Sequence, residues 1–146
     1  MLKFNLIRMK NIKGRSFVAI MIIVAVTSLL LRFGIERIIK INIIQNESVA
    51  QATVKLISTA LENYAKDNRS AFPSSLSLLA RSNPAYLDQD YISKSPIRGY
   101  EYSCSRLEPS GYACSAAPIK CDFSGKAIYT ITTGGSLVLE ECSKKE

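Results

Sequence analysis

The sequence predicts an α+β protein in which a long N-terminal helix packs on a small antiparallel β-sheet with disulfides. Two observations predict this fold. An uncharged apolar run at residues 17–31 is continued by a helical pattern that meets no Pro or Gly between Ile35 and Arg69. The last third holds short β-type runs separated by turn sequences, together with all four cysteines. A chain of 146 residues suits one small domain.

The apolar run is marginally long enough to cross a membrane. It contains fifteen residues without a charge, whereas a spanning helix usually needs about 20. Arg32 interrupts the run, but residues 33–35 continue its apolar character. A long arginine side chain can extend its charge to the membrane surface. The sequence therefore permits one membrane-spanning helix.

Basic residues before the run indicate its orientation. The net charge is +7, and four of the positive charges, on Lys3, Arg8, Lys10 and Lys13, precede Gly14 with no acidic residue among them. This placement is typical of a cytoplasmic flank. It favours membrane topology over nucleic-acid binding as the reason for the charge.

One helix is predicted from about residue 16 to about residue 66. Apolar or small residues recur every three or four positions in its second half, at Val49, Ala52, Leu56, Ala60 and Tyr64. A helix of about 50 residues is about 75 Å long, and a single small domain cannot bury all of it. The first half therefore needs lipid or neighbouring helices, and only the amphipathic second half has a face for its own domain.

The elements after this helix are shorter. Turn formers that end in Pro73 stop the helix, and Ser74 or Ser75 is the candidate N-cap of a short leucine-rich helix at residues 76–81. Strands are predicted at residues 100–106, 112–116, 127–132 and 137–141, with turns at residues 108–111 and 133–136.

The four cysteines predict disulfides formed in an oxidising compartment, because their number is even and all lie beyond the membrane segment. In a hairpin centred near Pro109, Cys104 and Cys114 are equidistant from the turn and can face each other. Cys121 can then reach Cys142, just past the last strand. This spacing favours the pairs Cys104–Cys114 and Cys121–Cys142 over the other two connectivities.

Enzymatic, metal-binding and DNA-binding functions have little support. The chain has no histidine, which removes the commonest general base and metal ligand, and no catalytic residue, cofactor or metal site is predicted. The gaps between successive cysteines, of 10, 7 and 21 residues, do not form the close pairs of structural zinc. The Asp88-Gln89-Asp90 segment lacks the other ligands of a calcium loop. The lysines that a DNA contact would use more often form a solvated face; they are Lys120, Lys126, Lys144 and Lys145.

Residues 13–26, with the sequence KGRSFVAIMIIVAV, resemble the prepilin signature of type IV pilins and type II secretion pseudopilins. Gly14 stands at the cleavage position, Ser16 replaces the usual Thr, and Met21 and Ala25 occupy their family places. Softer motifs follow in the family order: Phe72-Pro73, Gly99-Tyr100-Glu101-Tyr102, Ala117-Pro118, Gly125, Tyr129 and Gly134. The resemblance implies a pilin-like lollipop with a cytoplasmic leader at residues 1–14, a membrane and filament-core helix at 15–35, and a globular domain at 36–146.

The resemblance also implies a function in filament assembly. In this family a membrane aspartyl protease, the prepilin peptidase, cuts after the Gly and methylates the new N-terminus, here Arg15. The filament-core positions include Phe17, Ala19, Met21 and Ala25. The implied partners are that peptidase, other pilin or pseudopilin subunits, the inner-membrane assembly platform and lipid. The implied location is the bacterial inner membrane, with one pass and a periplasmic or extracellular C-terminal domain, and the filament after assembly.

Three residues depart from the family pattern. Arg15 replaces the usual Phe, and Ala19 replaces a Glu that is thought to pair with a neighbouring subunit's N-terminal amine. Minor pseudopilins at the filament tip also lack this acid, so the resemblance implies a minor or tip subunit. Glu36 replaces a frequent Pro, so the usual helix kink is not predicted.

Two anchoring modes compete with the filament subunit. The main alternative is an uncleaved, signal-anchored monomer that serves as a binding or scaffold protein, with a periplasmic disulfide-stapled domain. A conventional cleaved signal peptide has less support, because no small-x-small cleavage site follows the apolar run.

Overall fold

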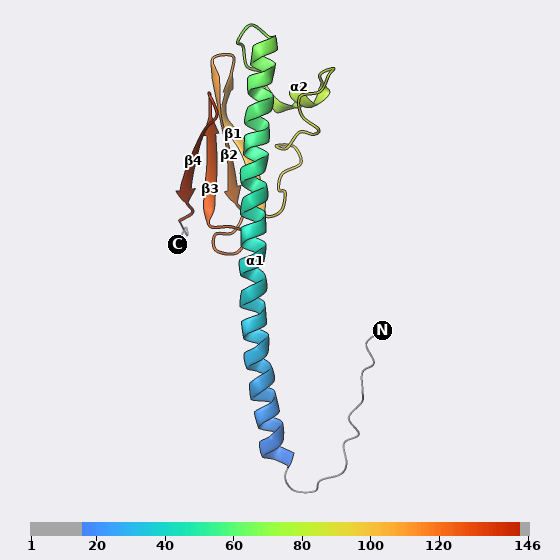
Figure 1. Ribbon diagram of the computed structural model, residues 1–146, viewed down its shortest axis with the longest axis vertical. Helices are drawn as coiled ribbons and strands as arrows, with labels where there is room; N and C mark the ends of the chain where they lie inside the picture. Colours follow the sequence, from blue (N-terminus) through green and yellow to red (C-terminus); the bar gives the residue numbers. More distant parts are fainter. Residues whose placement is uncertain (1–15, 144–146) are drawn as a thin grey trace. The chain divides into compact units, whose positions relative to one another are not determined.

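The computed structural model describes residues 16–143. Its fold is α+β, as predicted, with one long helix and one four-stranded antiparallel sheet. The chain divides into two compact units, Met1–Ile38 and Ile39–Glu146, and each is described by itself. Figure 1 labels the elements, which are α1 (Ser16–Asp67), α2 (Leu76–Arg81), β1 (Tyr100–Glu108), β2 (Gly111–Pro118), β3 (Ala127–Thr132) and β4 (Ser136–Glu141).

The helix α1 ends where the sequence predicts, at a cluster of turn formers. The Asn68 side chain donates to the Tyr64 carbonyl at 2.9 Å, and the Ser70 N–H donates to the Ala65 carbonyl at 2.7 Å. Arg69 and Ser70 adopt positive φ values of 56° and 64°. The left-handed turn and these bonds supply partners for carbonyls at the end of the helix, as a helix C-terminus requires.

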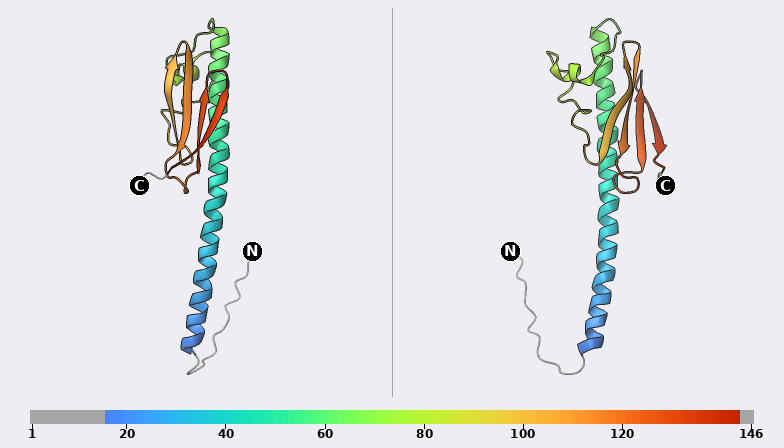
Figure 2. Two further views of the ribbon diagram at one scale, coloured as in Figure 1. Left: turned by 90° about the vertical axis from the view of Figure 1, so that its left-hand side faces the viewer. Right: turned by 180° about the vertical axis from the view of Figure 1, so that it is seen from behind.

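In the second unit, α1 packs along one face of the sheet, as the two views of Figure 2 show. Ala50, Val54, Ile57 and Leu61 recur every three or four residues and are buried against the sheet. The sheet has the order β1-β2-β3-β4, so each strand pairs with its neighbour in the chain. The side chains that it presents to the core are mostly aromatic or small: Tyr100, Tyr102, Cys114, Ala116, Tyr129 and Ile131.

The β1–β2 hairpin differs from its predicted geometry. Glu108 pairs with Gly111, so the turn consists of two residues, Pro109 and Ser110. A regular hairpin of that register would place Cys104 opposite Ser115. The register shifts between Cys104 and Arg106, and this irregularity brings Cys104 opposite Cys114. The strands also extend beyond the predicted ends, to Glu108 and from Gly111 to Pro118.

The short helix α2 forms at its predicted residues, and Leu76 and Leu79 anchor it in the core. Ser75 occupies the N-cap position with extended backbone angles, but its side chain makes no capping hydrogen bond. Its hydroxyl instead lies 2.9 Å from the Ser77 hydroxyl. The helix is therefore held by burial of its leucines rather than by the capping bond that Ser74 or Ser75 predicted.

Candidate functional site

The N-terminal part of α1 presents an apolar surface that nothing in its own unit covers. We call residues 17–31 the apolar segment. Its eleven large apolar side chains are 49–75% exposed. The most apolar 18-residue window of the helix has a mean hydropathy of 2.4, and among the described residues this helix is the one long and apolar enough to cross a membrane. Each such side chain gains about 1.5–3 kcal/mol on burial, so the segment needs lipid or neighbouring helices.

The polar side chains of the apolar segment are satisfied within the helix. The Thr27 hydroxyl lies 2.9 Å from the Ile23 carbonyl and 3.0 Å from the Val24 carbonyl. The Ser28 hydroxyl donates to the Ala25 carbonyl at 2.9 Å. A helix that satisfies its hydroxyls internally can lie in hydrocarbon without leaving these donors unpaired.

The predicted filament-core positions all lie on this exposed helix. Phe17, Met21 and Ala25 follow one another at intervals of four residues and therefore share a face, whereas Ala19 lies on another side. The predicted cleavage and methylation positions, Gly14 and Arg15, and the predicted leader before them lie outside the described residues.

Charged residues appear on α1 only after the apolar segment. The Arg32 Nε lies 3.6 Å from the Glu36 Oε1, one helical turn further on. Both side chains are exposed. This i,i+4 pair is the first ion pair after the apolar segment.

In the second unit, two acidic side chains of α1 hold the ends of the sheet. The Glu47 carboxylate accepts the Lys126 N–H at 2.7 Å, and the neighbouring Asn46 amide donates to the Ser124 carbonyl at 3.0 Å. Because both bonds reach the loop before β3, they fix one end of the sheet against the helix.

At the other end, Glu62 accepts two hydrogen bonds through one oxygen. The Gly134 N–H donates from 2.8 Å and the Tyr112 hydroxyl from 2.9 Å. The Tyr112 oxygen in turn lies 2.8 Å from the buried Ser58 hydroxyl, which is left as the donor. Burial, together with the hydrogen bond to Glu62, raises the pKa of Tyr112 above its usual value. The tyrosine is therefore a neutral donor throughout the physiological range.

The disulfides join the pairs that the cysteine spacing favours. Cys104–Cys114 links adjacent strands with a Cα–Cα distance of 3.9 Å, and Cys121–Cys142 links the loop before β3 to the residue after β4 with a distance of 5.9 Å. The described residues contain no free cysteine. The second disulfide holds the C-terminal end of the edge strand β4, and the Cys142 N–H donates to the Lys126 carbonyl at 2.8 Å.

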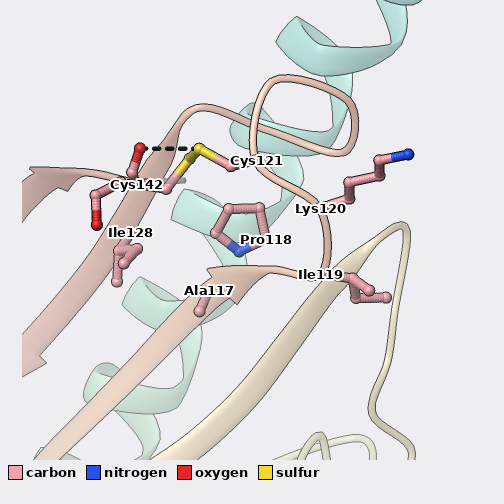
Figure 3. A pocket seen from close by; sticks show the side chains of 8 residues that line it. Ala117, Pro118, Ile119, Lys120, Cys121, Ile128 and Cys142 are labelled. Carbon is pink, nitrogen blue, oxygen red and sulfur yellow. Dashed lines mark hydrogen bonds between the residues drawn. A yellow bond between two sulfur atoms is a disulfide. The ribbon is translucent and has the colours of Figure 1, made fainter. Parts of the chain in front are cut away.

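An open hollow of about 600 Å³ lies beside the second disulfide. Figure 3 shows the disulfide at one side of it and Pro118 and Ala117 at the end of β2 below. The lining residues are Ala117, Pro118, Ile119, Lys120, Cys121, Ile128, Cys142 and Ser143. This lining is mainly apolar and offers one cation, Lys120, whose Nζ lies 5.3 Å from the centre of the Phe123 ring.

The residues of the Asp88-Gln89-Asp90 segment form hydrogen bonds with residues close to them in the chain. Asp88 accepts the Tyr91 hydroxyl, and Asp90 accepts the N–H groups of Ile92 and Ser93 as a turn does. Gln89 accepts a bond from Lys94. Within residues 16–143 no three His, Cys, Asp or Glu side chains lie together as a metal site would need.

The lysines that a DNA contact would use make different contacts in the structure. The Lys120 side chain lies over the Phe123 ring, and the Lys126 backbone N–H donates a hydrogen bond to the Glu47 carboxylate. Lys144 and Lys145 lie outside the described residues.

Comparison with known proteins adds no identification. No protein-family model matches the chain, and no match was found among curated proteins or solved structures.

Proposed function

We propose that the protein is a structural subunit of a type IV pilus or type II secretion pseudopilus, and Ala19 in place of the family's Glu favours a minor or tip position. One observation carries the proposal: the apolar segment of α1 exposes its side chains on every face and follows a basic stretch that ends in Lys13-Gly14. Such a helix is stable in lipid, and its apolar side chains can also be covered by similar helices at the centre of a filament.

The proposed life of the subunit has two stages. In the first, the apolar segment holds the chain in the inner membrane, with its domain periplasmic or extracellular. In the second, the prepilin peptidase cuts after Gly14 and methylates Arg15, and the platform moves the subunit into a filament. Because lipid tails are as apolar as the segment itself, association of the helices relies on close packing rather than on the hydrophobic effect.

The second unit suits a subunit exposed outside the cytoplasm. Its two disulfides cross-link the sheet and its loops. Glu47 and Glu62 of α1 accept hydrogen bonds from the Lys126 and Gly134 N–H groups, at opposite ends of the sheet. A domain built in this way keeps its shape without a large core. These features equally suit the alternative, an uncleaved signal-anchored monomer, so leader cleavage decides between the two.

The test is processing of the full chain in bacterial membranes that contain a prepilin peptidase. The wild type should be shortened, and a catalytically inactive peptidase should leave it intact. Gly14→Val should block shortening, because the resemblance places Gly14 directly before the cut bond. Lys13→Gln is the matched control and should be cut as the wild type is. Equal migration of the wild type with active and inactive peptidase would exclude the proposed maturation.

A further inference from the structure

Arg32 and Glu36 are the only charged residues of α1 between Ser16 and Glu36. Their ion pair spans 3.6 Å, and the side chains are 82% and 58% exposed. Together with Ala25 and Leu29 they recur every three or four residues, which places all four on one face of the helix. We call this face the charged stripe.

The surroundings of the charged stripe change when helices leave lipid for a helical assembly. In a bilayer, Arg32 lies at the end of the apolar segment and can extend its guanidinium to the headgroups. Among packed helices no headgroup is available, and a charged side chain needs a partner on its own helix or on a neighbour. Arg32 and Glu36 have one another, and each retains an exposed side that a neighbouring helix can approach.

Two parallel copies that meet through the charged stripe have two simple arrangements. With the helices in register, Arg32 faces Arg32 and Glu36 faces Glu36, so that like charges meet. With one copy shifted by four residues, about 6 Å along the axis, Arg32 of one copy lies opposite Glu36 of the other. Coulomb's law favours the shifted arrangement, and the preference increases in a low-dielectric surrounding.

We propose that Arg32 and Glu36 form a charge contact between copies of this chain that selects a one-turn stagger of neighbouring α1 helices. The inference rests on the proposed function and requires in addition that neighbouring subunits of the assembly are copies of this chain, which excludes a single copy that caps the tip. A staggered contact uses different residues on its two sides, so it repeats into an open chain, whereas the in-register contact would close a symmetric dimer. The contact that selects the stagger therefore lies at the C-terminal side of the apolar segment, because the segment itself has no charged residue.

The stagger is tested by disulfide cross-linking in membranes that also contain the filament-assembly machinery, so that α1 helices can leave lipid and pack together. Two differently tagged full-length copies are produced together, one with Ala25→Cys and the other with Leu29→Cys, four residues apart on the charged stripe. The expected product is the mixed dimer, in which the Ala25→Cys copy is linked to the Leu29→Cys copy. A prevalence of dimers between two copies that carry the same substitution, which the in-register arrangement produces, would overturn the proposal.

The charge contact is tested in the same assay by reversal and complementation. Arg32→Glu in both copies, or Glu36→Arg in both copies, should lower the mixed cross-link about threefold or more, the size of polar helix contacts in membranes. Arg32→Glu in the Ala25→Cys copy with Glu36→Arg in the Leu29→Cys copy swaps the two facing charges and should restore cross-linking between them. If the charges serve only the helix that carries them, the combination stays as low as either variant alone, and the proposal fails.

Two controls separate this outcome from other failures. Arg37→Glu reverses a neighbouring charge that points about 100° away from Glu36, and it should leave the cross-links unchanged. The N-terminus is sequenced in the same membranes. A chain cut after Gly14 that gives only in-register cross-links refutes the stagger alone, whereas an uncut chain without cross-links refutes the proposed function.

Discussion

Gly125 lies where the chain approaches the buried Tyr100 ring most closely. A Cβ at this position would overlap the Tyr100 hydroxyl and ring carbons. Tyr100 cannot move away easily, because it is fully buried and donates to the Ala127 carbonyl at 2.9 Å. The glycine is therefore required for steric reasons.

Gly125→Ala should destabilise the domain by about 2 kcal/mol, the usual cost of an overpacked site. Urea unfolding of the full protein in detergent, followed by near-ultraviolet circular dichroism, measures this loss. Ser136→Ala, at an exposed position of β4, is the control and should change stability by less than about 0.5 kcal/mol. Similar effects of the two substitutions would contradict the close packing of Gly125 against Tyr100.

The Tyr112 hydroxyl joins a buried serine to a carboxylate of α1. Tyr112→Phe keeps the ring, including its edge-on contact with Phe72 at 5.2 Å between centroids, and removes the bonds to Ser58 and Glu62. Because Ser58 is buried and loses its partner, the free energy of unfolding should fall by about 1–2 kcal/mol.

Tyr86→Phe is the matched control for this substitution. It also removes a tyrosine–carboxylate bond, of 2.6 Å to Asp67, but that bond is exposed to solvent. Its loss should cost clearly less in the same urea titration. If Tyr112→Phe proves as mild as Tyr86→Phe, the buried bonds do not hold β2 against α1 as described.

At the scale of elements, the Cys121–Cys142 disulfide secures the edge strand β4. The strand pairs only with β3 within the sheet, and Val138 and Leu139 are largely exposed. The disulfide and the bond from the Cys142 N–H to the Lys126 carbonyl hold the C-terminal end of the strand. Without them, β4 would rely on its pairing with β3 and on the partly buried Leu137.

The double substitution Cys121→Ser and Cys142→Ser should lower the free energy of unfolding by about 3 kcal/mol. Without the disulfide the unfolded chain gains conformational entropy, which favours unfolding. It should also raise hydrogen exchange in β4 more than in β1. The matched control is the double substitution Cys104→Ser and Cys114→Ser, which should raise exchange in the β1–β2 hairpin instead. Uniform exchange changes in both variants would contradict the local roles assigned to the disulfides.

The sequence predicts these elements well where the signal lies within one segment. The limits of α1 follow from an uninterrupted helical pattern and a turn cluster. The strand β3 follows from the apolar residues of 127–132, and the structure confirms it, with Ala127, Tyr129 and Ile131 buried. The irregularity after Cys104 was not predictable, because it is a property of two paired strands. The prediction placed the hairpin centre at Pro109, whereas the observed turn is centred between Pro109 and Ser110. The bulge between Cys104 and Arg106 offsets this difference, so the predicted pair Cys104–Cys114 still forms.

The contacts that hold the sheet on α1 were also beyond the sequence pattern. In the sequence, Glu47 and Glu62 look like ordinary polar residues of a helix. Their roles depend on the tertiary structure, which brings the N–H groups of Lys126 and Gly134 to their carboxylates. The apolar segment, by contrast, was identified from composition alone. Gly14 and Arg15 rest on the family resemblance, and they lie outside the described residues.

At the scale of the whole molecule, several tyrosines are protonated more firmly in the folded state than in the unfolded chain. Burial raises the pKa values of Tyr100, Tyr102 and Tyr112. A group whose folded pKa is raised contributes stability that is complete below its unfolded pKa, about 10 for tyrosine, and that is lost as the pH rises towards the folded value.

The domain should therefore lose stability as the pH rises above about 10. Tyrosinate absorbance of the buried tyrosines should increase together with the loss of circular dichroism in a rapid alkaline titration. Tyr102→Phe should shift this alkaline transition upwards relative to its own stability at neutral pH, because one ionisable buried group is removed. Titration of all tyrosines near pH 10 in a protein that keeps its native spectrum would contradict the raised pKa values.

In the proposed function, cleavage after Gly14 prepares the chain so that α1 can enter a filament. The most direct measurement is the intact mass and N-terminal sequence of the protein isolated from its own membranes. Prepilin processing predicts a chain that lacks residues 1–14 and begins with N-methylated Arg15. Retention of residues 1–14 would exclude this maturation and would favour the signal-anchored alternative.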